Sequence, residues 1–254
     1  MTGATRDPGS VQLRLLGHDG VHLADDESYR LPPQTAELLA YLELREGRTA
    51  RRPAIIRSLW PDKAERLGRR RLSRLLWRVN QAAPRELVIA EGETVRISDV
   101  LTSDWQQAHD ALAHPDWPHT PSLRNDLELL QLPLLVDLHS PWIEEHQRTW
   151  DQRRFYALRE AGEILLSRKR LREAVEIAEL LVTWEPLDEP SHLLLIRAHM
   201  KLGAPGRSTE LYQEFRRRLR KELGVEPTFE LEPGRGTGSF ERGSGPGDYR
   251  GVSA

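Results

Sequence analysis

The fold of the first part of this chain is decided by the stretch Arg70-Arg71-Leu72-Ser73-Arg74-Leu75-Leu76-Trp77-Arg78-Val79. Its apolar residues recur at intervals of three and four, which is the spacing of one face of an α-helix. On a helical wheel they fill one arc of about 100°. These residues are Leu72, Leu75, Leu76 and Val79. The spacing predicts a helix from about Lys63 to Ala83 that buries this arc in a core.

The opposite arc of the same helix is basic and carries one aromatic ring. Its members are Arg70, Arg74, Trp77 and Arg78, flanked by Ser73 and Arg71. A solvated, salt-bridged surface is the ordinary alternative, but the helix has almost no acids at the spacings that would neutralise the arginines. A guanidinium group can engage a phosphate, or the O6 and N7 atoms of guanine in the major groove. We expect five residues to face the groove: Arg70, Ser73, Arg74, Trp77 and Arg78, with Trp77 either against a sugar or packed under a neighbouring hairpin.

Patterns on both sides of this helix complete a winged helix-turn-helix. Residues 11–30 alternate between apolar and polar around the turn signal His18-Asp19-Gly20, which predicts short strands. Helices are expected over residues 34–45 and 52–60, where prolines and a glycine mark the ends. Residues 87–97 read as a β-hairpin. Strands, three helices and then a hairpin are the order of a winged helix-turn-helix.

The net charge of -2 hides an asymmetry along the chain. Residues 1–101 carry +3, residues 102–232 carry -6, and residues 48–78 hold eleven basic against two acidic side chains, a local charge of +9. Such a cluster indicates a polyanionic partner. The candidates for phosphate contacts are Arg51, Arg52 and Arg57 on the helix before the central one, Arg69 and Arg71 on the central helix, and Arg96 in the hairpin.

Residues 102–231 have helical periodicity almost throughout, apart from a loop over residues 114–121. Ser140-Pro141 predicts a capped start for a long helix. Further helices are expected over residues 171–184, 191–202 and 208–222. A register of 34 residues, the tetratricopeptide period, relates Ala161 to Leu195, Ala174 to Ser208, Glu176 to Glu210, Ile177 to Leu211 and Leu181 to Phe215. The expected core of these repeats includes Trp142, Trp150, Phe155, Tyr156 and Trp184, some of which could instead line a groove for a peptide or ligand.

The predicted fold class is mainly α, with an N-terminal α+β winged helix-turn-helix followed by an all-α, tetratricopeptide-like domain. The winged domain is predicted over residues 11–101 and the helical domain over residues 102–231. Residues 1–10 are expected to be disordered. So is the tail, residues 232–254, because it is rich in glycine and has too few apolar residues to offset its ordering entropy.

Several classes of protein are disfavoured by composition and motifs. The chain has no cysteine, which excludes disulfides, thiol nucleophiles and cysteine-based metal sites. The recurring histidines His109, His114 and His119 lie among prolines and lack a completing carboxylate pattern. No phosphate-binding loop occurs, and no nucleophile and base stand at a recognisable spacing. We therefore expect no enzyme activity, no catalytic residues, no metal and no cofactor. Without an apolar run that could span a bilayer or serve as a signal peptide, we expect no membrane association and a cytoplasmic protein.

Several stretches resemble a known family of bacterial regulators. Leu31-Pro32-Pro33-Gln34, Leu59-Trp60-Pro61-Asp62 and residues 71–79 resemble the OmpR-type DNA-binding domain of Streptomyces antibiotic regulatory proteins (SARPs). Pro141-Trp142-Ile143-Glu144, Glu185-Pro186-Leu187-Asp188-Glu189, His192 and residues 219–228 resemble their bacterial transcriptional activator domain (BTAD). The likeness covers about residues 11–230, and residues 222–227 are its most specific part. The central helix departs from the family in its Leu75-Leu76-Trp77-Arg78 run, so base preference cannot be carried over.

The resemblance implies a sequence-specific transcriptional activator of a secondary-metabolite (antibiotic) gene cluster, located at the bacterial nucleoid. Its implied partners are double-stranded promoter DNA, RNA polymerase holoenzyme, and a second protomer as a homodimer or side by side on repeats. The alternative is a tetratricopeptide-like scaffold for protein interaction or signalling whose winged domain no longer reads DNA. The +9 cluster argues against this alternative, and retention on heparin in moderate salt would separate the two.

Overall fold

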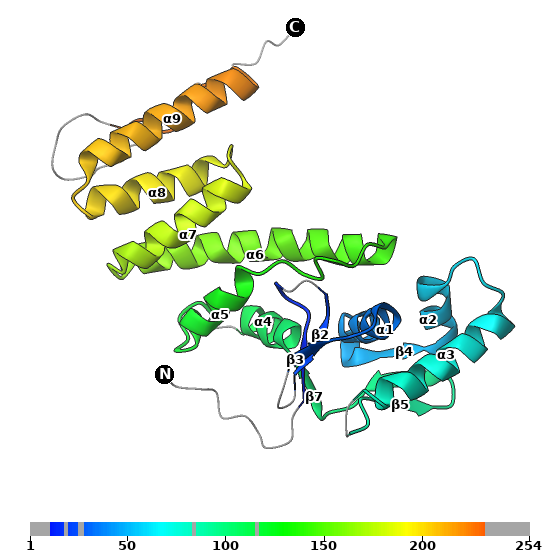
Figure 1. The fold of residues 1–254 in the computed structure, drawn as a ribbon. Coiled ribbons are helices and arrows are strands. Elements are labelled where there is room, and N and C mark those ends of the chain that lie inside the picture. Colours follow the sequence, from blue (N-terminus) through cyan, green and yellow to red (C-terminus); the bar gives the residue numbers. More distant parts are fainter. Residues whose placement is uncertain (1–10, 18–19, 25–27, 83–84, 115–116, 232–254) are drawn as a thin grey trace, which may run out of the picture. The chain divides into compact units, whose positions relative to one another are not determined.

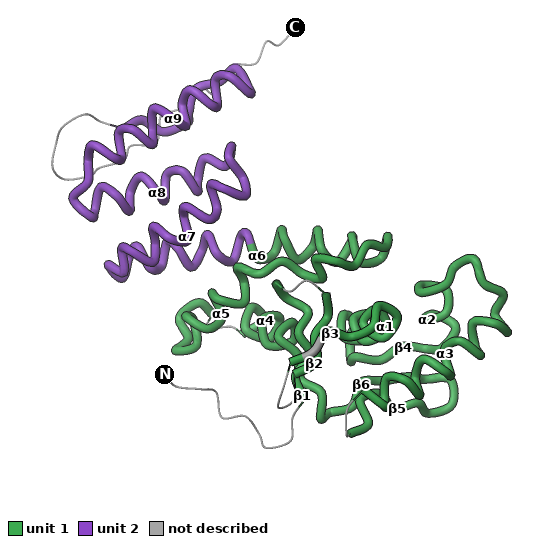
Figure 2. Tube along the Cα trace, viewed as in Figure 1, with its two compact units in different colours: residues 1–154 green, residues 155–254 purple. Residues whose placement is uncertain are grey.

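The computed structural model describes residues 11–17, 20–24, 28–82, 85–114 and 117–231. It forms two compact units, residues 1–154 and residues 155–254 (Figures 1 and 2). The expectations for residues 1–10 and 232–254, and for His18-Asp19 in the first turn, lie outside the described residues. The fold class is as expected: a winged helix-turn-helix followed by an all-α region.

A four-stranded sheet opens the first unit. Its order is β3-β2-β1-β7, with strands β1 Val11–Arg14, β2 His22–Ala24, β3 Ser28–Arg30 and β7 Leu101–Ser103. Strands β1 to β3 are antiparallel neighbours, whereas β7 lies parallel to β1 with Leu13 opposite Ser103. The sequence did not indicate β7, because three residues are too few to show an alternation. Its pairing places the predicted boundary between residues 101 and 102 inside a strand.

The three helices of the winged domain are α1 Pro33–Glu43, α2 Arg52–Leu59 and α3 Glu65–Asn80. Prolines stand in the first turn of α1 and α2, where the missing N–H costs no hydrogen bond. The predicted apolar arc of α3 is buried: the exposed fractions of its four residues lie between 0% and 7%. Local periodicity therefore gave both the existence and the orientation of α3 correctly.

The wing is a three-stranded sheet of order β4-β6-β5. The predicted hairpin is β5 Val88–Glu91 and β6 Thr94–Ile97, and its turn uses Gly92 at φ 57, a conformation that favours glycine. The third strand, β4 Thr49–Arg51, follows the short 3-10 turn η1 Glu46–Arg48. Arg51 therefore lies on a strand paired with Thr94 of β6, and the prediction that it belongs to the helix was wrong.

Three helices complete the first unit: α4 Asp104–Ala113, α5 Leu123–Leu130 and the start of α6 Pro141–Ser167. The boundary between the units falls inside α6, between Arg154 and Phe155. Ser103 caps α4, its Oγ accepting from the Gln106 N–H at 2.9 Å. The expected side-chain cap at Ser140 is not formed. Its Oγ is buried without a hydrogen-bond partner, and its carbonyl oxygen accepts from the N–H groups of the helix instead.

The second unit continues with α7 Leu171–Trp184, α8 Glu189–Lys201 and α9 Pro205–Leu223, each packed on the next (Figure 1). Asp188 caps α8 by accepting from the Ser191 N–H at 3.0 Å. Four of the five residue pairs at a spacing of 34 share their environment: for example, Ala174 and Ser208 are both fully buried, and Glu176 and Glu210 are both exposed. The fifth pair differs, because Ile177 is buried and Leu211 is half-buried. This agreement fits a repeated helix pair, and assignment to the tetratricopeptide class stays a prediction.

Some of the aromatic residues assigned to the repeat core lie elsewhere. Trp142 meets Tyr41 edge to face at 5.2 Å between ring centroids, and Trp150 meets Trp105 in the same way at 4.9 Å. Both contacts are within the first unit. Tyr156 is 52% exposed. The prediction was wrong for these residues because periodicity along α6 shows that a face is apolar, but it does not show what covers that face.

Candidate nucleic-acid interface

The outer face of α3 is open to solvent. Its predicted groove residues are all exposed, and Trp77 is 68% exposed, so its ring does not pack under the wing. Among the described residues, no side chain or backbone group forms an ion pair or a hydrogen bond with the guanidinium groups of Arg70, Arg74 and Arg78. The Ser73 hydroxyl donates to the Arg69 carbonyl at 3.0 Å. This face thus presents cations that have no partners within the described part of the chain, which is the arrangement an anionic ligand needs.

Two residues that the sequence analysis missed fix α3 in place. Gly68 is buried against α2: an added Cβ would lie 2.3 Å from Cγ2 of Ile56, so only glycine allows this close approach. At the other end of α3, the Asn80 side chain accepts from the N–H groups of Leu87 and Val88 and donates to the Val88 carbonyl, all at 2.9 Å. The signal for Asn80 was its place before a turn, because asparagine readily bonds nearby backbone.

The predicted phosphate contacts divide into two groups. Arg51 and Arg57 are exposed, without ion-pair partners among the described residues. The other four have contacts within the protein. Arg52 Nε donates to the Gly92 carbonyl at 2.8 Å, Arg69 pairs with Glu65 and Glu93, the Arg71 guanidinium lies 5.1 Å from the Trp60 ring centroid, and Arg96 lies 3.9 Å from Asp99. Arg66, which was not predicted, is exposed on α3.

At the wing tip, Arg69 and Glu93 each stabilise the charged form of the other. The hydrogen bond from Arg69 is the largest influence on Glu93 and lowers the pKa of its carboxyl group below the usual range, and the positive charges of Arg52 and Arg51 add to the effect. The same contact raises the pKa of Arg69. Glu93 is therefore ionised throughout the neutral range, and its charge partly offsets the basic cluster.

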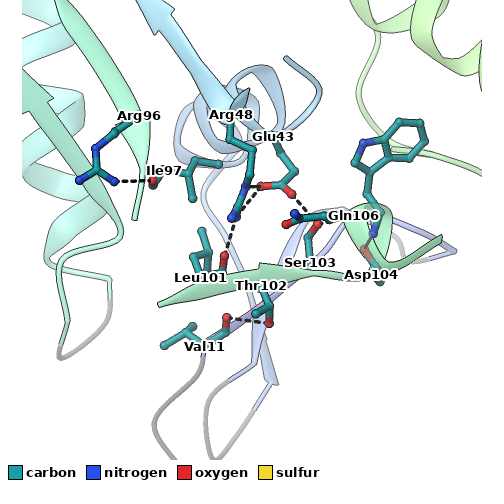
Figure 3. A network of polar contacts seen from close by, with 11 residues as sticks. Val11, Glu43, Arg48, Arg96, Ile97, Leu101, Thr102, Ser103, Asp104 and Gln106 are labelled. Carbon is teal, nitrogen blue, oxygen red and sulfur yellow. Dashed lines mark hydrogen bonds and ion pairs between the residues drawn. The ribbon is translucent and has the colours of Figure 1, made fainter. Parts of the chain in front are cut away.

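A buried polar network joins the winged domain to β7 and α4 (Figure 3). The Glu43 side chain is fully buried, and its carboxylate accepts from Arg48 Nε at 3.0 Å and from the Ser103 hydroxyl at 2.6 Å. Arg48 also donates to the Leu101 carbonyl at 2.5 Å. A buried carboxylate needs such partners, because its transfer out of water is otherwise strongly unfavourable. The network therefore ties α1, η1 and β7 together.

Asp104 makes a second link at the same junction. Its carboxylate accepts from the backbone N–H groups of Leu15 at 2.8 Å, Leu16 at 3.1 Å and Trp105 at 2.7 Å. Burial raises the pKa of Asp104 to about 6, although these hydrogen bonds favour the ionised form. Residues just beyond the predicted domain boundary thus satisfy backbone donors at the end of β1.

The described part of the chain offers no grouping of three or more histidine and carboxylate side chains able to hold a metal ion. None of the helices in that part is long and apolar enough to cross a membrane. The chemistry that the described surface does present is a basic, partly aromatic helix face beside a wing.

Comparisons with known proteins agree with this architecture. A family model described as the bacterial transcriptional activator domain matches residues 98–233. The regulatory protein AfsR of Streptomyces coelicolor is 27% identical over 236 residues, covering 87% of this chain and 23% of AfsR. A solved structure of Mycobacterium tuberculosis EmbR in complex with a low affinity phosphopeptide has a TM-score of 0.62 and 19% identity, covering 85% of this chain and 62% of EmbR. The chain thus spans less than a quarter of AfsR and about three fifths of that EmbR chain.

The family that these comparisons identify is one of transcriptional regulators and not of enzymes. The chain belongs to the bacterial transcriptional activator domain family, as a regulator of the Streptomyces antibiotic regulatory protein type. Regulators of this type bind DNA and act with the transcription machinery.

Proposed function

We propose that this protein is a sequence-specific activator that binds promoter DNA through the outer face of α3, with the wing on the adjacent backbone. The observation that carries the proposal is the exposed face of Arg70, Arg74, Trp77 and Arg78, for which the described residues supply no counter-charge. Arginine and tryptophan on such a face suit base edges and sugars. In this proposal Arg51 and Arg57 contact phosphates and so contribute affinity without sequence preference.

The proposal extends to the level of the promoter. Protomers bind side by side on repeated sites, in the cytoplasm at the nucleoid, and the helical region over residues 102–231 contacts RNA polymerase holoenzyme. The support for this division is charge: the helical region is net acidic and unsuited to DNA, whereas stacked helices offer an extended surface to proteins. The regulated genes are those of a secondary-metabolite cluster, in line with the family.

The test is a footprint of the full chain on the promoters next to its own gene, followed by titration of the protected duplex over a range of salt. With about five phosphate contacts for each protomer, log affinity should fall against log salt with a slope of about -4 to -5. A slope near zero, or no saturable binding to any duplex, would overturn the proposal in favour of a protein-interaction scaffold. Replacing Arg124, an exposed arginine on α5, by alanine is the control that should leave the slope unchanged.

A further inference from the structure

The turn at the tip of the wing is tied to α3 by a paired contact. Arg69 Nη1 donates to Glu93 Oε1 at 2.7 Å and Arg69 Nη2 donates to Glu93 Oε2 at 3.1 Å. Arg69 Nε donates to Glu65 one turn earlier on α3, at 3.0 Å. Two parallel hydrogen bonds between a guanidinium and a carboxylate restrict the orientation of both groups. The contact therefore fixes both the orientation of the wing tip and its distance from α3.

A second arginine holds the same turn from the start of α2. Arg52 Nε donates to the Gly92 carbonyl at 2.8 Å, and the Arg52 backbone N–H donates to the Glu93 carbonyl, also at 2.8 Å. Residues 92 and 93 are thus bonded to two helices at once. Arg52 and Arg69 are two of the cations that the sequence assigned to DNA phosphate, and both are engaged with the wing.

Arg69 is poorly placed to serve as a phosphate ligand. Three of the five N–H donors that a guanidinium offers are already taken by carboxylates. A phosphate that approached the remaining donors would also meet the negative charges of Glu65 and Glu93. Arg66 and Arg70, its neighbours on α3, have no such partners among the described residues and can meet an anion freely.

We propose that Arg69, with Glu93 and Arg52, is a positioning residue that locks the wing against α3 so that both meet DNA as one surface. This proposal rests on the DNA binding proposed above. Its consequence is geometric: Arg51 on β4 pairs with Thr94 beside the locked turn, and Arg96 on β6 pairs with Thr49. Fixing the turn therefore fixes these two wing arginines relative to the base-reading face of α3.

The first experiment needs no DNA. Amide hydrogen exchange in the full-length free protein should report the opening of residues 91–95, because exchange measures the local stability of a segment. Arg69→Ala and Glu93→Gln should each speed exchange in this segment, while the rest of the winged domain keeps its protection. Glu91→Gln and Arg66→Ala are the matched controls, since each removes one charge at a neighbouring exposed position. Unchanged exchange in the Arg69 and Glu93 variants would overturn the proposal.

The second experiment measures duplex DNA affinity against salt for the same variants. Relative to Arg124→Ala and Glu91→Gln, which remove charges of the same sign, Arg69→Ala and Glu93→Gln should each lower specific affinity by about threefold to tenfold, with the salt slope unchanged. Arg69→Lys, which keeps a cation beside Glu93, should recover most of the loss. If Arg69 binds phosphate instead, Arg69→Ala will reduce the slope by about 0.9 and Glu93→Gln will tighten binding more than Glu91→Gln does. If even the wild type binds no DNA, the proposed function fails, while the exchange result still decides whether Arg69 holds the wing.

Discussion

Arginine side chains lie in opposite environments on the outer face of α3 and at the junction where α1 and η1 meet β7. On α3, Arg74 and Arg78 are exposed, without partners among the described residues. At the junction, the guanidinium of Arg48 is largely buried and is committed to Glu43 and the Leu101 carbonyl. A cation in water is stable without a partner, whereas a buried one must be paired. This difference in burial distinguishes arginines that are available to bind a ligand from an arginine that stabilises the fold.

The largest expected effect on stability comes from the position at which the chain is truncated. A chain ending at Val100 lacks β7, Ser103 and Asp104, so it loses the strand beside β1 and leaves buried N–H groups at Leu15 and Leu16 without acceptors. We expect this chain to be unfolded or loosely folded, whereas one ending at Arg154 should unfold cooperatively.

Circular dichroism during urea titration compares the two chains. The comparison tests the predicted end of the winged domain at residue 101, because the compact unit that contains this domain extends to Arg154. A cooperative transition in the shorter chain, with native-like helix content, would show that β7 and Asp104 are dispensable for the winged domain.

The second effect concerns the buried ion pair. Glu43→Ala leaves Arg48 with an uncompensated charge and should lower the free energy of unfolding by about 3 kcal/mol or more. Arg74→Ala removes an exposed charge and should change it by less than about 0.5 kcal/mol. Chemical denaturation of both variants at equal salt makes the measurement. Equal losses of unfolding free energy in the two variants would contradict the contrast between the paired, buried Arg48 and the exposed Arg74.

The third effect depends on pH. The folded pKa of Asp104 is about 6, above its ordinary value of 3.8, so the folded state binds the extra proton between these values. The contribution of this carboxyl to stability is therefore greatest at low pH and falls as pH rises from about 4 to about 6, by at most about 3 kcal/mol. In Asp104→Asn this dependence should disappear.

The measurement is the unfolding free energy of wild type minus that of Asp104→Asn between pH 4 and 7, because subtraction removes the contribution of the other acids. We expect the difference to decrease with pH across this window. A difference that rises with pH would mean that the three backbone N–H donors outweigh burial and hold the folded pKa below its ordinary value.

Substitutions on the exposed face of α3 should have the smallest effects on stability. Their effects on DNA binding should be the most specific. Arg74→Ala and Arg78→Ala should each weaken specific binding by about 1–3 kcal/mol and narrow the gap between specific and random duplexes. Arg51→Ala should weaken both duplexes alike and reduce the salt slope by about 0.9. Competition titrations with both duplexes distinguish these outcomes. Equal loss of discrimination in all three variants would contradict the division into base and phosphate contacts.

Sequence patterns predicted the elements of the winged domain well but the partners of individual side chains poorly. The buried arc and the exposed arc of α3 follow from a spacing of three and four within sixteen residues, which is local information. The engagement of Arg69 with Glu93, 24 residues away, is not local. The local sequence offers Arg69 only Glu65, four residues before it, and gives no indication of the contact with Glu93.

The sequence alone determined that α3 is amphipathic, that a hairpin follows it, that a helical region comes next and that the family is one of transcription regulators. Only the tertiary structure decided that β7 joins β1, that Glu43 reaches Ser103 across 60 positions, and that Asp104 reaches Leu15 across 89. The physical reason is the separation along the chain over which each kind of interaction acts. Helical periodicity is set by neighbours within one or two turns, whereas the satisfaction of a buried carboxylate or a strand edge depends on groups that folding brings together from distant parts of the chain.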